Sequence, residues 1–274
     1  MKIIRFKSDD TKIYTGYDFN GKNASIIKGD IYSDFSVTRQ SKKVKTILSP
    51  VKHKVIFCIG LNYKLHAKET GLDLPKHPVV FMKNISAAAS HLDNIIIPLS
   101  CANKPEVDYE AELAVVIKRK AKNVLPEDAL DYVLGYTCAN DISARKWQMH
   151  AGANQWIKGK SFDTFCPFGP WIVTIDELQN PDNLDIECIL NGKTMQKSNT
   201  DDMIFSVAQI ISYLSQSTTL VPGTIILTGT PGGVGFTRNP PVYLKPGDIL
   251  ETKIEKIGVL KNQIIAETNS FQSS

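Results

Sequence analysis

The stretch DYEAELAVVI, from Asp108 to Ile117, places a carboxylate at every second position before it becomes wholly apolar. In a strand, alternate side chains share a face, so Asp108, Glu110 and Glu112 would point the same way. Like charges on one face are unfavourable unless water or a cation lies among them, and Ala114 to Ile117 are typical of a buried strand. The spacing therefore predicts a bound cation.

A second segment, YTCANDISARKWQ at 136–148, contains residues that could join this site. If a helical turn begins near Asn140, then Asp141, Arg145 and Gln148 fall at i, i+4 and i+7 on one side. A third carboxylate, a guanidinium and an amide would then face one space. Taken alone, the more ordinary interpretation is that Asp141 caps a helix and pairs with Arg145.

Lys160 lies in WIKGKSFDTFCPFGPW, residues 156–171, close to many aromatic residues. Burying an ammonium group is costly unless a carboxylate or an anionic ligand lies beside it. Lys160 is therefore a candidate site residue.

The segment GTIILTGTPGGVG, residues 223–235, runs from an apolar strand into a glycine-rich loop. The spacing of a phosphate-binding P-loop is absent and no helix clearly follows, which argues against a nucleotide site. Backbone amides and the hydroxyl of Thr230 facing a small anionic ligand fit this loop better. A plain tight turn is the alternative.

His66 and Glu69 lie three positions apart in GLNYKLHAKE, a segment with helical character. On one face of a helix, the carboxylate would orient the imidazole and raise its basicity, which suits a general base. By itself, a surface ion pair is the more ordinary explanation.

The composition is that of a globular protein of 274 residues, with 42% hydrophobic and 22% charged residues and a net charge of +4. The basic clusters SKKVK and KRKAK have no interleaved aromatic residues, which argues against nucleic acid as a partner. No apolar run has the length of a signal peptide or of a membrane span. We expect a soluble intracellular protein, cytoplasmic or mitochondrial, with no membrane partner.

The five cysteines are widely spaced and never form a CxxC pair, which argues against a zinc ribbon and a disulfide framework and for a reducing compartment. A thiol hydrolase built on Cys58 or Cys166 is also disfavoured. Both lie in apolar runs, where burial raises the pKa of a thiol.

Strands dominate the predicted elements. Residues 1–54 alternate short strands with turns and a polar linker, and they predict a small N-terminal β region; residues 55–274 form the main domain. Asn191-Gly192 predicts a tight hairpin. One clear helix is expected after the capping candidates Asn199, Thr200 and Asp201, with its apolar stripe on Met203, Val207, Ile210, Ile211 and Leu214. The expected fold is a β-rich α+β roll or barrel.

Taken in order, these segments resemble the fumarylacetoacetate hydrolase superfamily. The motifs are GLNYxxHAxE, YExEL, YTxANDxSAR, GKSFDTFCPxGPW, NG, SNT and LTGTPxGVG followed by LKPGD, and they extend from Val55 to Ile264. Within this superfamily, the chain most resembles the fumarylacetoacetate hydrolase domain-containing proteins of the second type. The segments that carry this resemblance are SARKWQM, GKSFDTFCP and MQKSNTDDM.

The resemblance implies a mixed β-sandwich roll, a homodimer, and one Mg²⁺ or Mn²⁺ ion held by Glu110, Glu112 and Asp141. It also implies that Lys160 is the active-site lysine and that His66 and Glu69 are an acid–base pair on a mobile lid. Arg145, Gln148 and Thr230 would contact the substrate. The chain departs from the family pattern at Leu65, where an aspartate is common, and at Lys83-Asn84, where a Lys-Pro pair is common.

The same resemblance implies a small 2-oxo acid as substrate. Three carboxylates select a hard cation and leave about three coordination positions for water and a chelating 2-oxo acid. Such chelation makes it easier to move a proton at the neighbouring carbon. Keto–enol tautomerisation of oxaloacetate is the first hypothesis. The alternatives are carbon–carbon hydrolysis of acylpyruvate or fumarylacetoacetate-like acids, oxaloacetate decarboxylation, and a non-catalytic protein that binds a metal and a 2-oxo acid.

Overall fold

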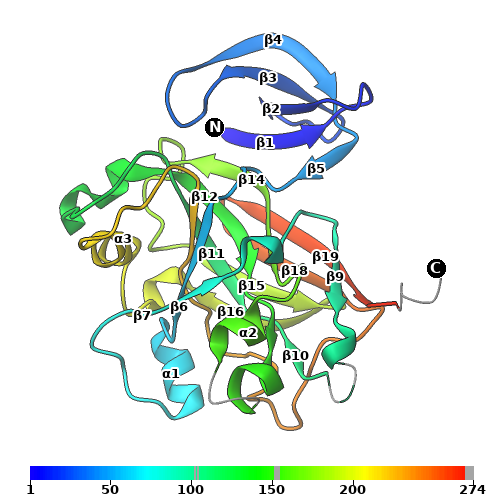
Figure 1. Cartoon of the computed structure of the whole chain (residues 1–274), viewed down its shortest axis with the longest axis vertical. Coiled ribbons are helices and arrows are strands. Elements are labelled where there is room, and N and C mark those ends of the chain that lie inside the picture. The colour runs from blue at the N-terminus through cyan, green and yellow to red at the C-terminus, as the bar shows by residue number, and fades with distance from the viewer. Residues whose placement is uncertain (102, 104, 151–154, 269–274) are drawn as a thin grey trace.

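The computed structural model of the chain describes residues 1–101, 103, 105–150 and 155–268, and the elements below lie within these ranges. Two large β-sheets dominate the molecule, and the helices are short (Figure 1). Most neighbouring strands are antiparallel, and the pairs that join residues 224–227 to 55–58 and residues 263–266 to 94–97 are parallel. The expected β-rich mixed architecture is confirmed.

The larger sheet has 12 strands and a main order of β4-β3-β2-β1-β14-β12-β11-β17-β6-β7. Two short strands, β5 and β8, pair with β1 and β14 beside this path. Its members are β1 (Lys2–Lys7), β2 (Ile13–Tyr17), β3 (Asn23–Gly29), β4 (Phe35–Lys43), β5 (Thr46–Leu48), β6 (Val55–Gly60), β7 (Val79–Lys83), β8 (Ala88–Ala89), β11 (Ala111–Ile117), β12 (Val133–Asn140), β14 (Cys166–Thr174) and β17 (Thr224–Leu227).

The second sheet has five strands in the order β16-β15-β18-β19-β9, and a further pair joins β10 to β13. The bounds are β9 (Asn94–Ile97), β10 (Val107–Asp108), β13 (Ser143–Ala144), β15 (Asp185–Leu190), β16 (Lys193–Asn199), β18 (Ile249–Ile254) and β19 (Gly258–Ala266). Asn191 and Gly192 connect β15 to β16 with φ values of 51° and 78°, so the predicted tight hairpin is confirmed.

Strand β11 lies at the centre of the fold and is buried on both faces. Leu113 and Val115 pack in a core that includes β15 and β18 of the five-stranded sheet. Ala114 and Val116 face the other way and pack in a core that includes residues of β1 and β3. Because both faces are covered, the strand is apolar at consecutive positions, as a buried strand requires.

The N-terminal strands β1 to β5 lie at one end of the molecule (Figure 1). They bury a small core of their own around Ile4 and Phe6, yet β1 also pairs with β14, where Ile3 lies opposite Ile172. The N-terminal strands therefore extend the large sheet. The boundary between residues 54 and 55 stays a prediction.

The helices are α1 (Lys64–Thr70), α2 (Trp156–Lys160) and α3 (Val207–Ser215), with 3-10 turns at η1 (Ile85–Ala87), η2 (Leu99–Cys101), η3 (Pro126–Tyr132) and η5 (Thr200–Asp202) and a π-helix at η4 (Lys146–His150). Within the described residues, no helix is long and apolar enough to cross a membrane.

The start of α3 differs from the prediction. Ser206 forms the N-terminal cap of this helix through a reciprocal capping box with Gln209. Asn199 instead caps the 3-10 turn η5, where its side chain accepts a hydrogen bond from the amide of Asp201. Met203 therefore lies before the helix, although it is buried in the same core as Val207.

The predicted helical turn from Asn140 is wrong. Asn140 ends β12, and residues 143–144 form β13, which pairs with β10. The helical segment begins only at Lys146. Backbone pairing between distant segments overrides the local helix-capping pattern here, because it satisfies the polar backbone groups of a buried segment.

Candidate active site

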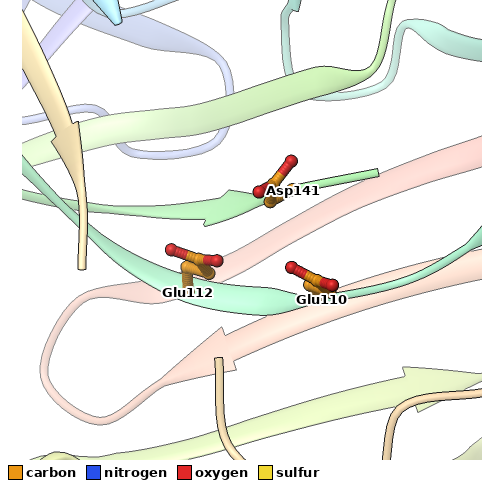
Figure 2. Close-up of side chains that lie close together, drawn as sticks. All are labelled: Glu110, Glu112 and Asp141. Carbon is orange, nitrogen blue, oxygen red and sulfur yellow. The ribbon is translucent and has the colours of Figure 1, made fainter. Parts of the chain in front are cut away.

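Three carboxylates converge where β11 and β12 lie side by side. Glu112 lies in β11, Glu110 just precedes this strand, and Asp141 directly follows β12. The pairing of Ala111 with Asn140 brings these segments together, and the amide of Asp141 donates to the carbonyl of Glu110 over 2.8 Å. Figure 2 shows the three side chains around one space, where ligand oxygens of all three lie within 4.8 Å of one another.

Asp108 does not join this cluster. Among the described residues, the group close enough to hold a metal ion is Glu110, Glu112 and Asp141. Strand β10 ends at Asp108 and β11 begins at Ala111, so the strand is interrupted between them. The alternation of side chains expected for one continuous strand therefore does not extend through Asp108, Glu110 and Glu112. The exclusion of Asp108 agrees with the ligands that the family resemblance implies.

Buried cations surround the carboxylates. Lys160 Nζ donates to Glu110 Oε2 over 2.9 Å, to Asp141 Oδ2 over 2.8 Å and to the hydroxyl of Ser143 over 2.7 Å. Arg145 Nη1 lies 2.6 Å from Glu110 Oε1. The predicted carboxylate partners of Lys160 are therefore present.

Lys83 is a second lysine of the site. Its side chain donates to Asp141 Oδ1 and, over 3.1 Å, to the carbonyl of Ile142. In the sequence, Lys83 is notable only because Asn84 follows it where the family commonly has proline. Its position two residues after Phe81 indicates burial, because alternation in β7 places Phe81 and Lys83 on the same buried face.

The surroundings shift the pKa values of the two glutamates in opposite directions. Burial alone would raise the pKa of Glu110, but attraction to Lys160 and Arg145 outweighs it and lowers this pKa to about 2. Burial, followed by repulsion from Asp141 and Glu110, raises the pKa of Glu112 well above its ordinary value. A divalent cation bound between them would favour the ionised form of both.

The donor set fits a hard divalent cation. Three buried carboxylates, with no sulfur or imidazole in the group, are the ligands that Mg²⁺ and Mn²⁺ prefer. Glu112 Oε2 accepts a hydrogen bond from the amide of Gly229 over 2.6 Å, which orients the carboxylate. Such support from outside the ligand set is typical of metal sites in proteins.

Helix α1 presents His66 and Glu69 as predicted. His66 Nδ1 lies 3.2 Å from Glu69 Oε2. Glu69 also accepts from the amide of Gly233 over 3.0 Å and from the hydroxyl of Thr237 over 2.8 Å. Burial acts to raise the pKa of Glu69, but these hydrogen bonds, that from His66 first, lower it overall.

One pocket of about 520 Å³ contains most of the predicted site residues. Its polar lining includes His66, Thr70, Glu110, Glu112, Arg145, Gln148, Lys160 and Thr230. Its apolar lining includes Ile59, Leu61, Leu72, Val79, Phe81, Met149, Trp156 and Phe236. Concave sites with a few convergent polar groups in an apolar wall are typical of small-molecule sites.

The three expected substrate contacts line this pocket, and all three already have partners within the protein. Arg145 Nη1 donates to Gln148 Oε1 over 2.9 Å, which leaves the amide nitrogen of Gln148 as a donor for a ligand. The hydroxyl of Thr230 donates to the carbonyl of Ala111 over 2.9 Å and accepts from Gln196 over 2.8 Å.

The amides of the glycine-rich loop serve the protein's own carboxylates. Gly229 donates to Glu112 and Gly233 to Glu69, and the amides at 235 and 236 donate to Asp108. The expectation that backbone amides of this loop bind a free anion is therefore wrong for these four. The loop instead connects the carboxylate cluster to α1.

All five cysteines are free and buried. Burial raises the pKa of Cys166 to about 12 and that of Cys58 well above its ordinary value. Neither thiol is therefore poised as a nucleophile, in agreement with the sequence prediction.

Comparison with known proteins identifies relatives of the chain. The family model described as fumarylacetoacetate (FAA) hydrolase C-terminal matches residues 55–265. Oxaloacetate tautomerase FAHD2A, mitochondrial, from Bos taurus is 48% identical over 221 residues, which cover 80% of this chain and 69% of the relative. A fumarylacetoacetate hydrolase domain-containing protein 2 homolog from Dictyostelium discoideum is 48% identical over 227 residues, covering 80% of this chain and 73% of that protein.

Solved structures share the fold over nearly the whole chain. The 2-hydroxyhepta-2,4-diene-1,7-dioate isomerase from Mycobacterium marinum has a TM-score of 0.83 at 34% identity and covers 98% of this chain and 100% of its own. A fumarylacetoacetate hydrolase from Exiguobacterium antarcticum has a TM-score of 0.85 at 33% identity, over 97% of this chain and 100% of its own. This chain therefore belongs to the fumarylacetoacetate hydrolase superfamily of enzymes, in the branch of the fumarylacetoacetate hydrolase domain-containing protein 2.

Proposed function

We propose that this chain is a Mg²⁺- or Mn²⁺-dependent enzyme that interconverts the keto and enol forms of oxaloacetate. The observation that carries the proposal is the meeting of three buried carboxylates, Lys160 and the His66–Glu69 pair at one pocket. A pure binding protein would have no need of a base held beside its ligand. The relatives named oxaloacetate tautomerase support oxaloacetate as the substrate.

Glu110, Glu112 and Asp141 would hold the metal ion. When bound, such an ion withdraws electron density from the oxo group of a chelating 2-oxo acid and makes the proton on the neighbouring carbon more acidic. Mg²⁺ and Mn²⁺ are the ions that an all-carboxylate set favours.

His66 would carry the proton. Glu69 engages Nδ1, so the opposite ring nitrogen is the one that can take a proton from the carbon next to the oxo group of oxaloacetate. Return of this proton to the oxo oxygen gives the enol, and return to carbon regenerates the ketone. The ammonium of Lys160, whose pKa remains raised by Asp141 and Glu110 in spite of burial, would stabilise the negative charge that develops between these transfers.

The decisive experiment follows the absorbance of enol-oxaloacetate with purified protein, with and without Mg²⁺, while pyruvate release is assayed in the same sample. We expect fast metal-dependent loss of enol without pyruvate. Glu110→Gln is the matched variant, because it keeps the shape of the side chain but removes a ligand charge; it should fold and be inactive. Full activity in metal-free buffer would contradict the metal mechanism.

Carbon–carbon hydrolysis of an acylpyruvate or a fumarylacetoacetate-like acid is the second candidate. The apolar side of the pocket, which includes Leu72, Val79 and Trp156, favours it, because oxaloacetate has no apolar tail to fill this space. His66 would then activate a water molecule. Release of pyruvate from an acylpyruvate, with no effect on enol-oxaloacetate, would select this function; release of pyruvate from oxaloacetate would select decarboxylation.

We further propose that the chain forms a homodimer. Strand β7 ends the large sheet and exposes Val79, Val80 and Met82 at 37%, 39% and 40%, beside Ile157 of α2 at 55%. An unpaired sheet edge with neighbouring apolar side chains is a surface that a second copy would cover. Light scattering after gel filtration tests this, and a monomeric mass would contradict it.

We also propose a mitochondrial location, which the names of several relatives support over a cytoplasmic one. Fractionation of cells that express the full chain tests this proposal. Recovery of the protein only in the cytosolic fraction would contradict it.

A further inference from the structure

Asp108, the acidic residue outside the carboxylate cluster, accepts four hydrogen bonds close to the pocket. It is fully buried at the end of β10. Oδ1 accepts from the amides of Tyr109 over 2.8 Å and Gly235 over 2.7 Å. Oδ2 accepts from the amide of Phe236 over 3.0 Å and from Arg145 Nε over 2.9 Å. Asp108 does not line the pocket, so any effect on the reaction passes through its partners.

Arg145 is the partner that reaches the pocket. Nε and Nη2 of Arg145 face Asp108, and Nη2 lies 2.8 Å from Asp108 Oδ2. Nη1 of Arg145 lies 2.6 Å from Glu110 Oε1 and 2.9 Å from Gln148 Oε1. The guanidinium also lies 4.4 Å above the ring of Phe236. The edge formed by Nε and Nη2 therefore faces Asp108, and Nη1 is the nitrogen that contacts Glu110 and Gln148.

The surrounding backbone is fitted to this carboxylate. A Cβ atom added to Gly235 would lie 2.4 Å from Asp108 Oδ1 and 1.9 Å from the carbonyl of Val242. Only glycine permits so close an approach of the loop, and the approach lets two consecutive amides donate to Asp108. Asp108 therefore joins the glycine-rich loop to Arg145.

We propose, on the basis of the metal centre proposed above, that Asp108 is a positioning residue that limits the contact of Arg145 with Glu110 to Oε1 and keeps the guanidinium away from Oε2. Without Asp108, the planar fork of the guanidinium would be free to bind both oxygens of Glu110, the geometry that arginine and carboxylates favour. Arg145 would then compete with the metal ion for Glu110, and Gln148 would lose the bond that aims its amide at the ligand.

The test measures binding of Mn²⁺ alone to the full-length protein by calorimetry, for the wild type, Asp108→Asn, Arg145→Gln and the double variant. We expect Asp108→Asn to raise the Kd for Mn²⁺ by about 10- to 100-fold, the range found when residues that support metal ligands are removed. Because the proposed effect passes through Arg145, the double variant should bind Mn²⁺ no more weakly than Arg145→Gln alone.

Asp182→Asn is the matched control. Asp182 accepts a hydrogen bond from the amide of Val207 at the start of α3 and does not line the pocket, so its loss should leave the Kd unchanged. An unchanged Kd in Asp108→Asn, or losses that multiply in the double variant, would overturn the proposal.

If Asp108→Asn does not fold, Arg145→Lys tests the same geometry. A single ammonium cannot contact Asp108, Glu110 and Gln148 together, so the Kd should again rise by at least tenfold. An unchanged Kd in a folded Arg145→Lys would overturn the proposal. A wild-type protein that binds no Mn²⁺ would instead contradict the metal centre and with it the proposed function.

Discussion

At the scale of single residues, the site works by giving neighbouring carboxylates unequal partners. Glu110 has two cations beside it, Lys160 and Arg145. Glu112 is bonded to the amide of Gly229 and faces the charges of Asp141 and Glu110. These surroundings therefore lower the pKa of Glu110 and raise the pKa of Glu112.

This inequality predicts that metal binding depends on pH. Because the pKa of Glu112 is raised, the group carries a proton below that pKa, and binding of a cation releases it. The affinity for Mn²⁺ should therefore rise as the pH increases toward the raised pKa and level off above it. Calorimetry in buffers of different ionisation enthalpy measures both the affinity and the proton released. A Kd that is constant from pH 5 to pH 8 would contradict the assignment.

Lys83 supplies a second prediction at this scale. Lys83→Met leaves the buried carboxylate of Asp141 without one of its two cationic partners, and loss of one member of a buried pair typically costs about 3 kcal/mol of unfolding free energy. Chemical denaturation in the presence of EDTA measures this loss. Excess Mg²⁺ should restore part of it, because the ion supplies positive charge at the same carboxylates.

Lys197→Met is the control for that measurement. Its ammonium lies 3.4 Å from Glu187 with the side chain 71% exposed, so its removal should change the unfolding free energy by less than about 0.5 kcal/mol. Equal losses in the two variants would show that Asp141 does not depend on Lys83.

The sequence predicts the carboxylates better than their partners. Glu110 and Glu112 are recognisable because alternating acids before an apolar run have no ordinary structural explanation. Lys160 follows from the cost of burying an amine, whereas the assignment of Asp141 as a metal ligand comes from the family resemblance. The contacts of Lys83 and Asp108 cannot be predicted from local patterns, because their partners are distant in the sequence. Lys83 and Asp141 are 58 positions apart, and Asp108 and Gly235 are 127 positions apart.

At the scale of elements, the glycine-rich loop and helix α1 act together. The loop donates amides to Glu112, to Asp108 and to Glu69 of α1, so one segment contacts both the carboxylate cluster and the proposed acid–base pair. Movement of this loop would change the distance between His66 and the metal ligands.

Thr237→Val tests this coupling. It removes the hydroxyl that donates to Glu69 over 2.8 Å, and hydrogen bonds to charged groups contribute roughly 1.5–3 kcal/mol. We expect kcat/KM to fall by about tenfold or more and hydrogen exchange in α1 to become faster. Thr38→Val, which removes a bond to Ile26 in the remote strands β3 and β4, should change neither quantity. Unchanged exchange in α1 would mean that Thr237 does not hold the helix.

Element prediction succeeds where the periodicity of the sequence reflects burial. The runs VIFCIG and AELAVVI coincide with β6 and β11, and Asn191-Gly192 forms its hairpin. It fails at Asn140, which ends a strand, and at Asn199, which caps the 3-10 turn η5 and not α3. Asn140 donates its side-chain amide to Thr252 of β18 and accepts from the amide of Glu110, which precedes β11.

At the scale of the whole molecule, the order of the strands lies beyond sequence reasoning. The hydroxyl of Thr174 donates to the carbonyl of Met1, 173 positions away, and this contact joins the N-terminal strands to the central sheet. The alternation of short strands and turns, followed by a polar linker, predicts a separate β region at residues 1–54. It does not reveal that β1 pairs with β14, because the two strands lie far apart in the sequence and local patterns do not specify a distant partner.

This pairing predicts that the N-terminal strands unfold together with the catalytic domain. Ile3 is fully buried opposite Ile172, so Ile3→Ala should lower the unfolding free energy by about 2–5 kcal/mol while thermal unfolding remains a single transition. Ile13→Ala is the control, because that side chain is 52% exposed and its loss should cost less than about 0.5 kcal/mol. If Ile3→Ala instead produced an early, separate transition, residues 1–54 would be an independent unit, and the active site should then survive that first transition with its Mn²⁺ affinity unchanged.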